Sequence, residues 1–213
     1  MRRTKEDALA TRQQLLDAAE RVFAVKGVSR TSLADIAQAA GTTRGAIYWH
    51  FKNKADLFNA MMDRITLPME SALCEHAQSE AQDPLEQVVQ SMLDVMHKVA
   101  HDPRTRQVFE VATLKVEYVD ELLAVQERHR AVYSRCVEQI QHGIETSAQR
   151  QGLQLTVPTH QAANGLHALV IGLIQSWLVA PNAFDLEATA RQVLTIYLKG
   201  LLGSATPSAP ATC

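Results

Sequence analysis

Apolar residues recur at helical spacing along almost the whole chain, and no segment alternates between apolar and polar residues over a useful length. Most prolines and glycines fall between the periodic segments. The pattern predicts an all-α protein, with helices over residues 5–26, 32–40, 44–50, 54–79, 83–101, 102–113, 119–150, 159–179 and 185–202. Pro68 lies inside the fourth helix, where it should remove a backbone hydrogen bond and bend the helix.

The first helices carry local start and stop signals. Ser32 precedes the second helix and Asp35 follows three positions later, which is the spacing of a capping box. Gly27 and Gly41 follow the first and second helices, and Thr43 is placed to cap the third. Two short helices joined by a glycine-containing turn of this length form a helix-turn-helix.

The chain therefore divides into a small head and a larger body. We expect a three-helix helix-turn-helix domain in residues 1–65, joined by one long helix to a helical body in residues 66–203. Residues 204–213 contain no core-forming side chains and should be a disordered tail.

The charge follows this division. Residues 1–60 hold 10 Lys+Arg against 6 Asp+Glu, a net charge of +4, and the remaining residues hold 11 against 17, a net charge of −6. The whole-chain charge of −2 argues against a nucleic-acid-binding protein. Residues 1–60 taken alone carry the positive net charge expected of a domain that binds nucleic acid, and the net charge of the whole chain does not show this.

Composition and missing motifs exclude several classes of protein. With 213 residues, 46% of them hydrophobic and 21% charged, the chain reads as an ordinary globular protein. Its uninterrupted apolar runs are far shorter than the roughly 20 residues of a bilayer span, and no apolar segment follows the basic start. We therefore expect a cytoplasmic protein with no membrane partner. No nucleophile elbow, phosphate loop or zinc-protease motif is present, so we expect neither an enzyme nor a cofactor.

The three cysteines Cys74, Cys136 and Cys213 lie far apart and form no disulfide or metal pattern. This usage suits a reducing compartment, and inert thiols are the preferred interpretation, with a redox-sensing thiol as the alternative.

The third helix carries the candidate chemistry. Ile47 and Phe51 lie four positions apart and should face inward. The residues left on or near the outside are Arg44, Gly45, Tyr48, Trp49 and His50. In a DNA major groove, Arg44 could reach base edges, Gly45 would allow close approach, and the aromatic and imidazole donors could contact phosphates. The alternative is a generic packing unit whose aromatic residues only cover a core.

The segment Leu33–Lys54, and above all the run from Gly41 to Lys54, resembles the DNA-binding domain of the TetR family of transcriptional regulators. The opening Arg3-Thr4-Lys5-Glu6, with Thr11-Arg12 further on, resembles the AcrR-type branch, which comprises local repressors of multidrug efflux operons. The likeness is dense over about the first 65 residues and continues more loosely to Trp177-Leu178 and beyond. Thr42 stands where the family usually has a small apolar residue.

The resemblance implies which residues contact DNA, with the third helix in the major groove. The implied DNA-binding residues are Ser32, Thr43, Arg44, Gly45, Tyr48, Trp49, His50 and Lys54. Lys54 would pair with a phosphate, while Ser32 would cap its helix and also touch the backbone. Arg2, Arg3 and Lys5 look like a mobile basic arm, with a solvated tail as the alternative.

The helix over residues 159–179 carries a strip of small residues beside its apolar face. The strip comprises Gly165, Ala168, Gly172 and Ser176, and the last helix adds Val193 and Tyr197. An intramolecular core is one interpretation, whereas the resemblance assigns these two helices to a four-helix homodimer interface. A dimer would place two recognition helices on successive major grooves of a palindromic or pseudopalindromic DNA operator.

The resemblance also implies a small-molecule site enclosed by the helices from about residue 83 to residue 150. The candidate ligand-binding residues are Met92, Met96, Glu110, Leu114, His167, Ile171 and Trp177. Glu110 lies among apolar neighbours and could favour cationic lipophilic ligands, with a paired carboxylate as the alternative. For His167 the alternative is a core histidine with its hydrogen bonds satisfied.

His97 and His101 lie four positions apart on one helix, one turn after Asp94, and this spacing can hold a metal ion. The sequence identifies no third ligand, so an exposed polar face is preferred and no metal site is predicted.

Taken together, the sequence predicts a homodimeric TetR-family repressor, controlling a multidrug efflux operon and released by a lipophilic inducer. A ligand would favour a second arrangement of the helices around residues 104–118, and operator DNA would weaken ligand binding by the same factor. The alternative is a regulator of another operon that answers to a different metabolite, a protein partner or a thiol oxidant.

Overall fold

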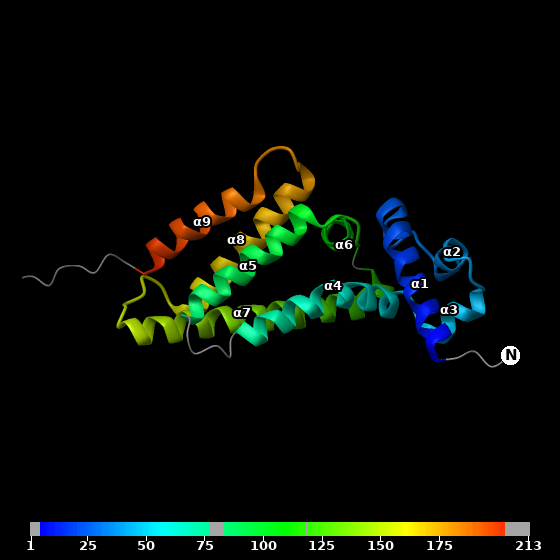
Figure 1. Ribbon diagram of the computed structural model, residues 1–213, viewed down its shortest axis with the longest axis horizontal. Helices are drawn as coiled ribbons and strands as arrows, with labels where there is room; N and C mark the ends of the chain where they lie inside the picture. Colours follow the sequence, from blue (N-terminus) through cyan, green and yellow to red (C-terminus); the bar gives the residue numbers. More distant parts are fainter. Residues whose placement is uncertain (1–4, 77–82, 118, 203–213) are drawn as a thin grey trace, which may run out of the picture. The chain divides into compact units, whose positions relative to one another are not determined.

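The computed structural model describes residues 5–76, 83–117 and 119–202, and they form an all-helical fold without strands (Figure 1). The elements are α1 (Lys5–Lys26), α2 (Leu33–Ala39), α3 (Arg44–His50), α4 (Lys54–His76), α5 (Pro84–His101), α6 (Pro103–Leu114), the 3₁₀ turn η1 (Asp120–Leu122), α7 (Leu123–Gln151), α8 (Thr159–Val179) and α9 (Leu186–Leu201). The predicted fold class is confirmed, and the predicted helix ends agree with these to within a few residues. Arg2 and Arg3 of the predicted arm, and the predicted tail 204–213, lie outside the described residues.

Local signals set the ends of the first helices as the sequence predicts. Ser32 and Asp35 form the complete capping box of α2: the Asp35 amide donates to Ser32 Oγ, and the Ser32 amide donates to the Asp35 carboxylate. Thr43 Oγ1 accepts from the Ala46 amide at the start of α3. Gly41, in the turn between α2 and α3, has φ +66°, a backbone region that other residues rarely adopt. The helix-turn-helix is therefore specified by short-range chemistry.

The chain forms two compact units. The first comprises Met1–Glu70 with His101–Val132, and the second comprises Ser71–Ala100 with Tyr133–Cys213. The sequence expectation divides the chain at one point, after residue 65, whereas the first unit also includes α6, η1 and the beginning of α7. The reason is burial: Val108, Val111 and Leu122 lie in the same hydrophobic core as the head helices, which no local pattern reveals.

The core of the first unit is built from the helix faces that the periodicity predicts. Its fully buried members include Leu15, Leu16, Phe23, Ile36, Ile47, Phe51, Leu57 and Met61. Phe23 and Phe58 contact each other in a tilted arrangement, with ring centroids 6.1 Å apart. Ile47 and Phe51 bury the inner side of α3, so the opposite side of that short helix faces solvent.

A charged network fixes α6 against α1 inside the first unit. The Arg104 guanidinium donates to both Glu20 carboxylate oxygens and to Asp17, at 2.9–3.3 Å. Arg64 of α4 reaches the same two carboxylates, at 2.7 Å from Asp17 and 3.3 Å from Glu20. Burial raises the pKa of Glu20 even though the hydrogen bonds and charge of Arg104 act to lower it. Glu20 is the buried member of this network, with a side-chain exposure of 7%, so losing Arg104 would leave a buried carboxylate with less compensation and weaken the contact between α1 and α6.

The second unit packs α5, α7, α8 and α9 around a separate core. Its buried members include Leu85, Met96, Ile144, Leu166, Ile174, Trp177, Leu186 and Leu194. Asp83 accepts hydrogen bonds from Ser147 and Gln151 of α7, at 2.8 and 2.9 Å, which ties the start of α5 to α7. Tyr197 of α9 donates to the Ala162 carbonyl oxygen of α8 at 2.8 Å.

Among the described residues, α8 is the one helix long and apolar enough to cross a bilayer, with a mean hydropathy of 1.4 over its best 18-residue window. The core helix of a water-soluble protein meets the same criterion. Leu166, Ile174 and Trp177 of α8 lie in the core of the second unit, which accounts for its apolar character.

Candidate nucleic-acid interface and effector region

The solvent side of α3 carries a cationic and aromatic surface. Trp49 is 79% exposed and Tyr48 is 50% exposed, and Arg44 is also exposed. The Arg44 guanidinium lies 6.0 Å from the centre of the Tyr48 ring, and Trp49 contacts His50 edge to face. A large exposed indole that covers no core is unusual in a monomer surface and suits a partner-binding role. The structure therefore brings together the residues that the sequence places outside on the third helix.

Gly45 lies in the first turn of α3 and is exposed. A Cβ at this position would meet only Thr43 Oγ1, at 4.0 Å, and its φ lies outside the region reserved for glycine. The fold itself thus has room for a larger residue here. Because the fold does not require glycine here, the absence of a side chain is consistent with close approach of a bound partner to the start of α3.

Ser32 is exposed, and α2 already uses both functions of its hydroxyl. Ser32 Oγ donates to the Asp35 carboxylate at 2.6 Å and accepts from the Asp35 amide at 3.1 Å. Asp35 is also paired with Lys26 at 2.8 Å. The hydrogen bond from Lys26, followed by those from Ser32, holds the pKa of Asp35 well below its ordinary value. Ser32 therefore acts first as a helix cap.

Lys54 does not resemble an open phosphate-binding lysine. Its side chain is 8% exposed, and its ammonium donates to the carbonyl oxygens of Ser29 and Thr31, each at 3.0 Å. The same ammonium is paired with Glu121, which precedes α7. Sequence reasoning could not find these partners, since Glu121 lies far along the chain. The contacts make Lys54 a link between the helix-turn-helix and the later part of the first unit.

The predicted ligand-binding residues fall into the two units. Glu110 and Leu114 belong to α6 in the first unit, where Glu110 pairs with Lys115 at 3.1 Å and Leu114 is exposed. The paired-carboxylate interpretation thus describes Glu110 in this structure. The first unit contains a small cavity of about 30 Å³, lined by Phe58, Asn59, Met62, Ala112, Val125, Arg128 and His129, none of which the sequence reasoning named.

The other predicted ligand-binding residues belong to the second unit. Met96 is fully buried, Trp177 is nearly so, and Met92 and Ile171 are half-buried. His167 contacts the Tyr133 ring edge to face, at 5.0 Å between centroids. An open surface groove of about 440 Å³ lies elsewhere in this unit, lined by Glu145, Ala148, Gln149, Gly152, Leu153, Leu155, Val157, Pro158 and Thr159.

The predicted dimer strip divides into two kinds of position. Ala168 and Ser176 are exposed, and a Cβ on Gly172 would meet no atom within 4 Å. A Cβ on Gly165 would instead lie 2.5 Å from the Tyr197 hydroxyl of the same chain. Gly165 and Tyr197 therefore pack against each other within one protomer. Val193 is half-buried on α9.

Helices α2 and α3 form a helix-turn-helix, and α3 exposes cationic and aromatic side chains. Followed by a helical body, this arrangement is that of a DNA-binding transcription regulator. Residues 15–61 match the family model for bacterial regulatory proteins of the tetR family, and residues 83–202 match the C-terminal region of MAATS-type transcriptional repressors. The chain belongs to the TetR family of transcription regulators.

Three relatives illustrate the similarity. The HTH-type transcriptional regulator AcrR of Shigella flexneri is 36% identical over 211 residues, which cover 99% of this chain and 98% of that protein. The structure of NalD, the secondary repressor of the MexAB-OprM multidrug efflux pump in Pseudomonas aeruginosa, is 37% identical with a TM-score of 0.85, covering 93% of this chain and 98% of NalD. The SmeT–triclosan complex is 29% identical with a TM-score of 0.81, covering 94% and 96% of the two chains; SmeT represses the SmeDEF pump of Stenotrophomonas maltophilia.

Proposed function

We propose that this protein represses a multidrug efflux operon from a palindromic operator and that a lipophilic ligand releases it. The observation that carries the proposal is similarity over the whole length to repressors of this kind, combined with the exposed Arg44–Trp49 surface of α3. The relevant compartment is the cytoplasm, where operator DNA lies.

The DNA contacts follow from the exposure of each side chain. Arg44 offers the bidentate donor that reads guanine in the major groove. Tyr48, Trp49 and His50 supply donors and flat surfaces for backbone and base edges, and Gly45 leaves room for close approach. Thr43 and Ser32 are exposed and orient their helices as N-caps, and we propose that both also contact the DNA. Lys54 joins them through the fold, because its ammonium holds the carbonyl oxygens that precede α2.

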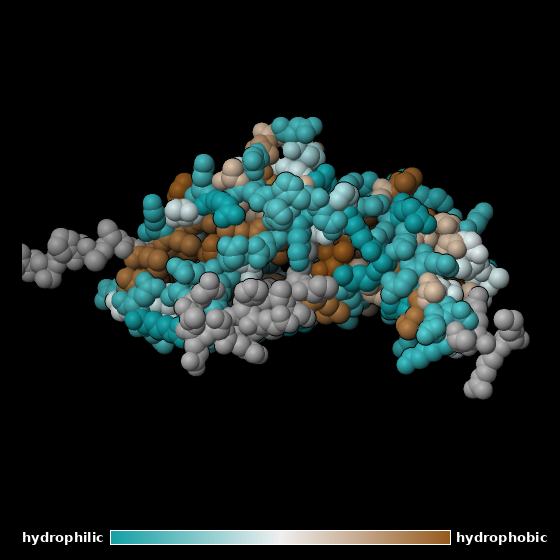
Figure 2. All heavy atoms as spheres, viewed as in Figure 1, coloured by the Kyte–Doolittle hydropathy of each residue, from teal (hydrophilic) through white to brown (hydrophobic). Residues whose placement is uncertain are grey.

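Homodimerisation would use the exposed part of α8 and α9. The open strip of Ala168, Gly172 and Ser176 lets a helix backbone approach closely. Val179 and Ile196 are each 70% exposed, which is unfavourable for an unpartnered surface. Figure 2 shows hydrophobic side chains gathered in a band alongside α9. Two subunits related by a two-fold axis would present two α3 helices to a palindrome.

Release would pass through α6. The triclosan complex of SmeT shows that one relative binds a small lipophilic molecule. We propose that the same class of ligand binds here, near the half-buried or buried residues Met92, Met96, Ile171 and Trp177. Arg104 and Glu20 couple α6 to α1 inside the first unit. A ligand that favours a second position of α6 would therefore disturb the helix against which the helix-turn-helix packs. By linkage, operator DNA must weaken the binding of that ligand by the same factor.

The test is operator binding with and without a panel of lipophilic efflux substrates. The upstream region of the gene should show a protected palindrome in footprinting, and at least one panel member should remove the protection. Affinity should fall steeply with rising salt. Undiminished protection across the whole panel would favour a regulator that answers to another signal.

Arg44→Ala tests the DNA surface, with Arg130→Ala as a matched control because Arg130 is also an exposed arginine of the first unit. The first change should weaken operator binding by about 1–3 kcal/mol and relax preference at one base pair. The control should leave both unchanged. Equal operator affinity in the two variants would remove Arg44 from the interface.

A further inference from the structure

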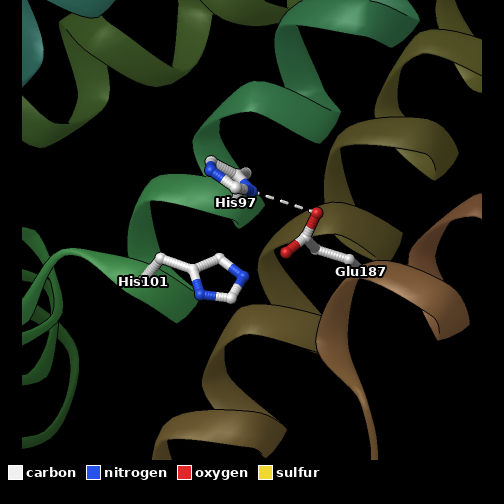
Figure 3. A group of neighbouring side chains, drawn as sticks. All are labelled: His97, His101 and Glu187. Atoms are coloured by element: carbon white, nitrogen blue, oxygen red, sulfur yellow. Dashed lines mark ion pairs between the residues drawn. The ribbon is translucent and has the colours of Figure 1, made fainter.

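Two histidines of α5 and one glutamate of α9 point toward one another on the protein surface (Figure 3). His97 Nδ1 lies 3.1 Å from Glu187 Oε2. One ligand atom from each of His97, His101 and Glu187 lies within 4.8 Å of the other two. The sequence supplies the two histidines at helical spacing, but only the packing of α9 supplies the carboxylate.

The positions of the three side chains are set by regular elements. His97 and His101 are separated by one turn of the continuous helix α5, of which His101 is the last residue, so both imidazoles project from one face. Glu187 lies in the first turn of α9, which Asp185 caps by accepting from the Ala188 amide at 2.9 Å. A site carried on helices holds its geometry better than a site on loops.

The spacing fits a small coordination sphere. Zn²⁺ binds imidazole nitrogen and carboxylate oxygen at about 2.0–2.2 Å, so tetrahedral ligand atoms lie about 3.3 Å apart. The His97–Glu187 distance is already close to this value, and the other atoms, within 4.8 Å, need only side-chain rotation. His97 is 60% exposed, which leaves a fourth position open to water.

We propose that His97, His101 and Glu187 form a binding site for a divalent transition-metal ion, with Zn²⁺ as the expected ion. Two imidazoles and one carboxylate suit Zn²⁺ and its neighbours in the first transition row, whereas Mg²⁺ and Ca²⁺ prefer oxygen ligands throughout. Asp94, the acid that the sequence places one turn earlier, accepts from Gln90 at 2.8 Å and is not a member of the group.

The ion would join the end of α5 to the start of α9. Binding would therefore stabilise the fold by mass action, because the unfolded chain does not hold these three groups together. The site does not depend on the proposed repressor function, and metal binding and operator release are separate measurements.

The experiment is calorimetric titration of the untagged, metal-free full-length protein with Zn²⁺ at pH 7.5. The expected result is one Zn²⁺ per chain and a rise of the melting temperature with Zn²⁺ that Mg²⁺ does not produce. His97→Ala, His101→Ala and Glu187→Gln should each weaken Zn²⁺ binding at least about tenfold and abolish the thermal shift. These side chains are exposed or half-exposed, so circular dichroism should show unchanged helicity.

His142→Ala is the matched control, since His142 is an exposed histidine one turn from Glu145 with no second histidine. It should bind Zn²⁺ as the original protein does. Equal Zn²⁺ affinity in His97→Ala, His101→Ala and the original chain would overturn the proposal. So would a loss of binding in the control as large as in these variants. Titration with Co²⁺ gives a second readout, in which visible absorption bands of a four-coordinate site should appear in the original protein and be absent in His101→Ala.

Discussion

Replacing Lys54 by methionine distinguishes a structural role of this residue from a direct contact with DNA. Methionine keeps most of the apolar stem and removes the ammonium. Lys52, two positions earlier and exposed, provides the matched control Lys52→Met. If Lys54 mainly binds a phosphate, the substitution should change operator binding alone. The structure instead indicates a loss of folding stability.

The expected loss can be worked from three contacts of the Lys54 ammonium. The Thr31 carbonyl oxygen is buried, and leaving it without a donor costs about 1–3 kcal/mol. Water can reach the partly buried Ser29 carbonyl oxygen, so that contact contributes about 0.5–1 kcal/mol. The ion pair with Glu121, which is 54% exposed, contributes about 0–1 kcal/mol. The sum predicts a decrease of about 1.5–5 kcal/mol in the free energy of unfolding.

The assay is urea unfolding at a fixed protein concentration, because the proposed homodimerisation would make apparent stability depend on concentration. With an m-value of about 2 kcal/mol/M, the midpoint of Lys54→Met should fall by about 0.8–2.5 M. Lys52→Met should unfold within about 0.5 kcal/mol of the original protein. The slope of log affinity against log salt concentration, measured where the variant is folded, should not change.

A different pair of results would refute this reasoning. If Lys54→Met unfolds at the original midpoint and the salt slope falls by about 1, the ammonium contacts a phosphate and its intramolecular contacts contribute little.

Two further substitutions test packing and electrostatics. Gly165→Ala should lower the free energy of unfolding by about 1–3 kcal/mol, because the new Cβ would lie 2.5 Å from the Tyr197 hydroxyl. Gly200→Ala, in the open on α9, should not destabilise, and equal urea midpoints for the two variants would contradict the close contact. The hydrogen bond from Lys26, with others from the N-cap of α2, places the folded-state pKa of Asp35 below its ordinary value of 3.8. A carboxyl of this kind stabilises the fold above its unfolded pKa and loses that contribution as pH falls through the folded value, so Asp35→Asn should flatten the acid-induced decrease in melting temperature below about pH 4. An unchanged pH profile would show that the ion pair is not important for folding.

The helix-turn-helix could be predicted from the sequence because the signals that specify it are local. The capping box of Ser32 and Asp35, the cap Thr43 and the glycine turn at Gly41 each act over three or four residues. The apolar residues of each buried face recur at helical spacing within one helix. Once the buried face of α3 is assigned, the opposite face, with Arg44 at its start, must be exposed.

The contacts of individual charged residues required the tertiary structure. The family resemblance assigns Lys54 to a phosphate, and only the fold places Thr31 and Glu121 around its ammonium. The link between Arg104 and Glu20 joins residues 84 positions apart, and it puts α6 in the same compact unit as the head. No periodicity carries such information, since it describes one helix at a time.

The sequence by itself determined the all-helical class, the helix ends and the exposed surface of α3 that we propose to face DNA. Only the tertiary structure decided which residues share a contact: Gly165 with Tyr197 inside one chain, and His97 with Glu187 across two helices. The physical reason is range. Caps, turns and amphipathic faces are set by neighbours within about one helical turn, whereas the partner of a side chain depends on which helices the hydrophobic core brings together.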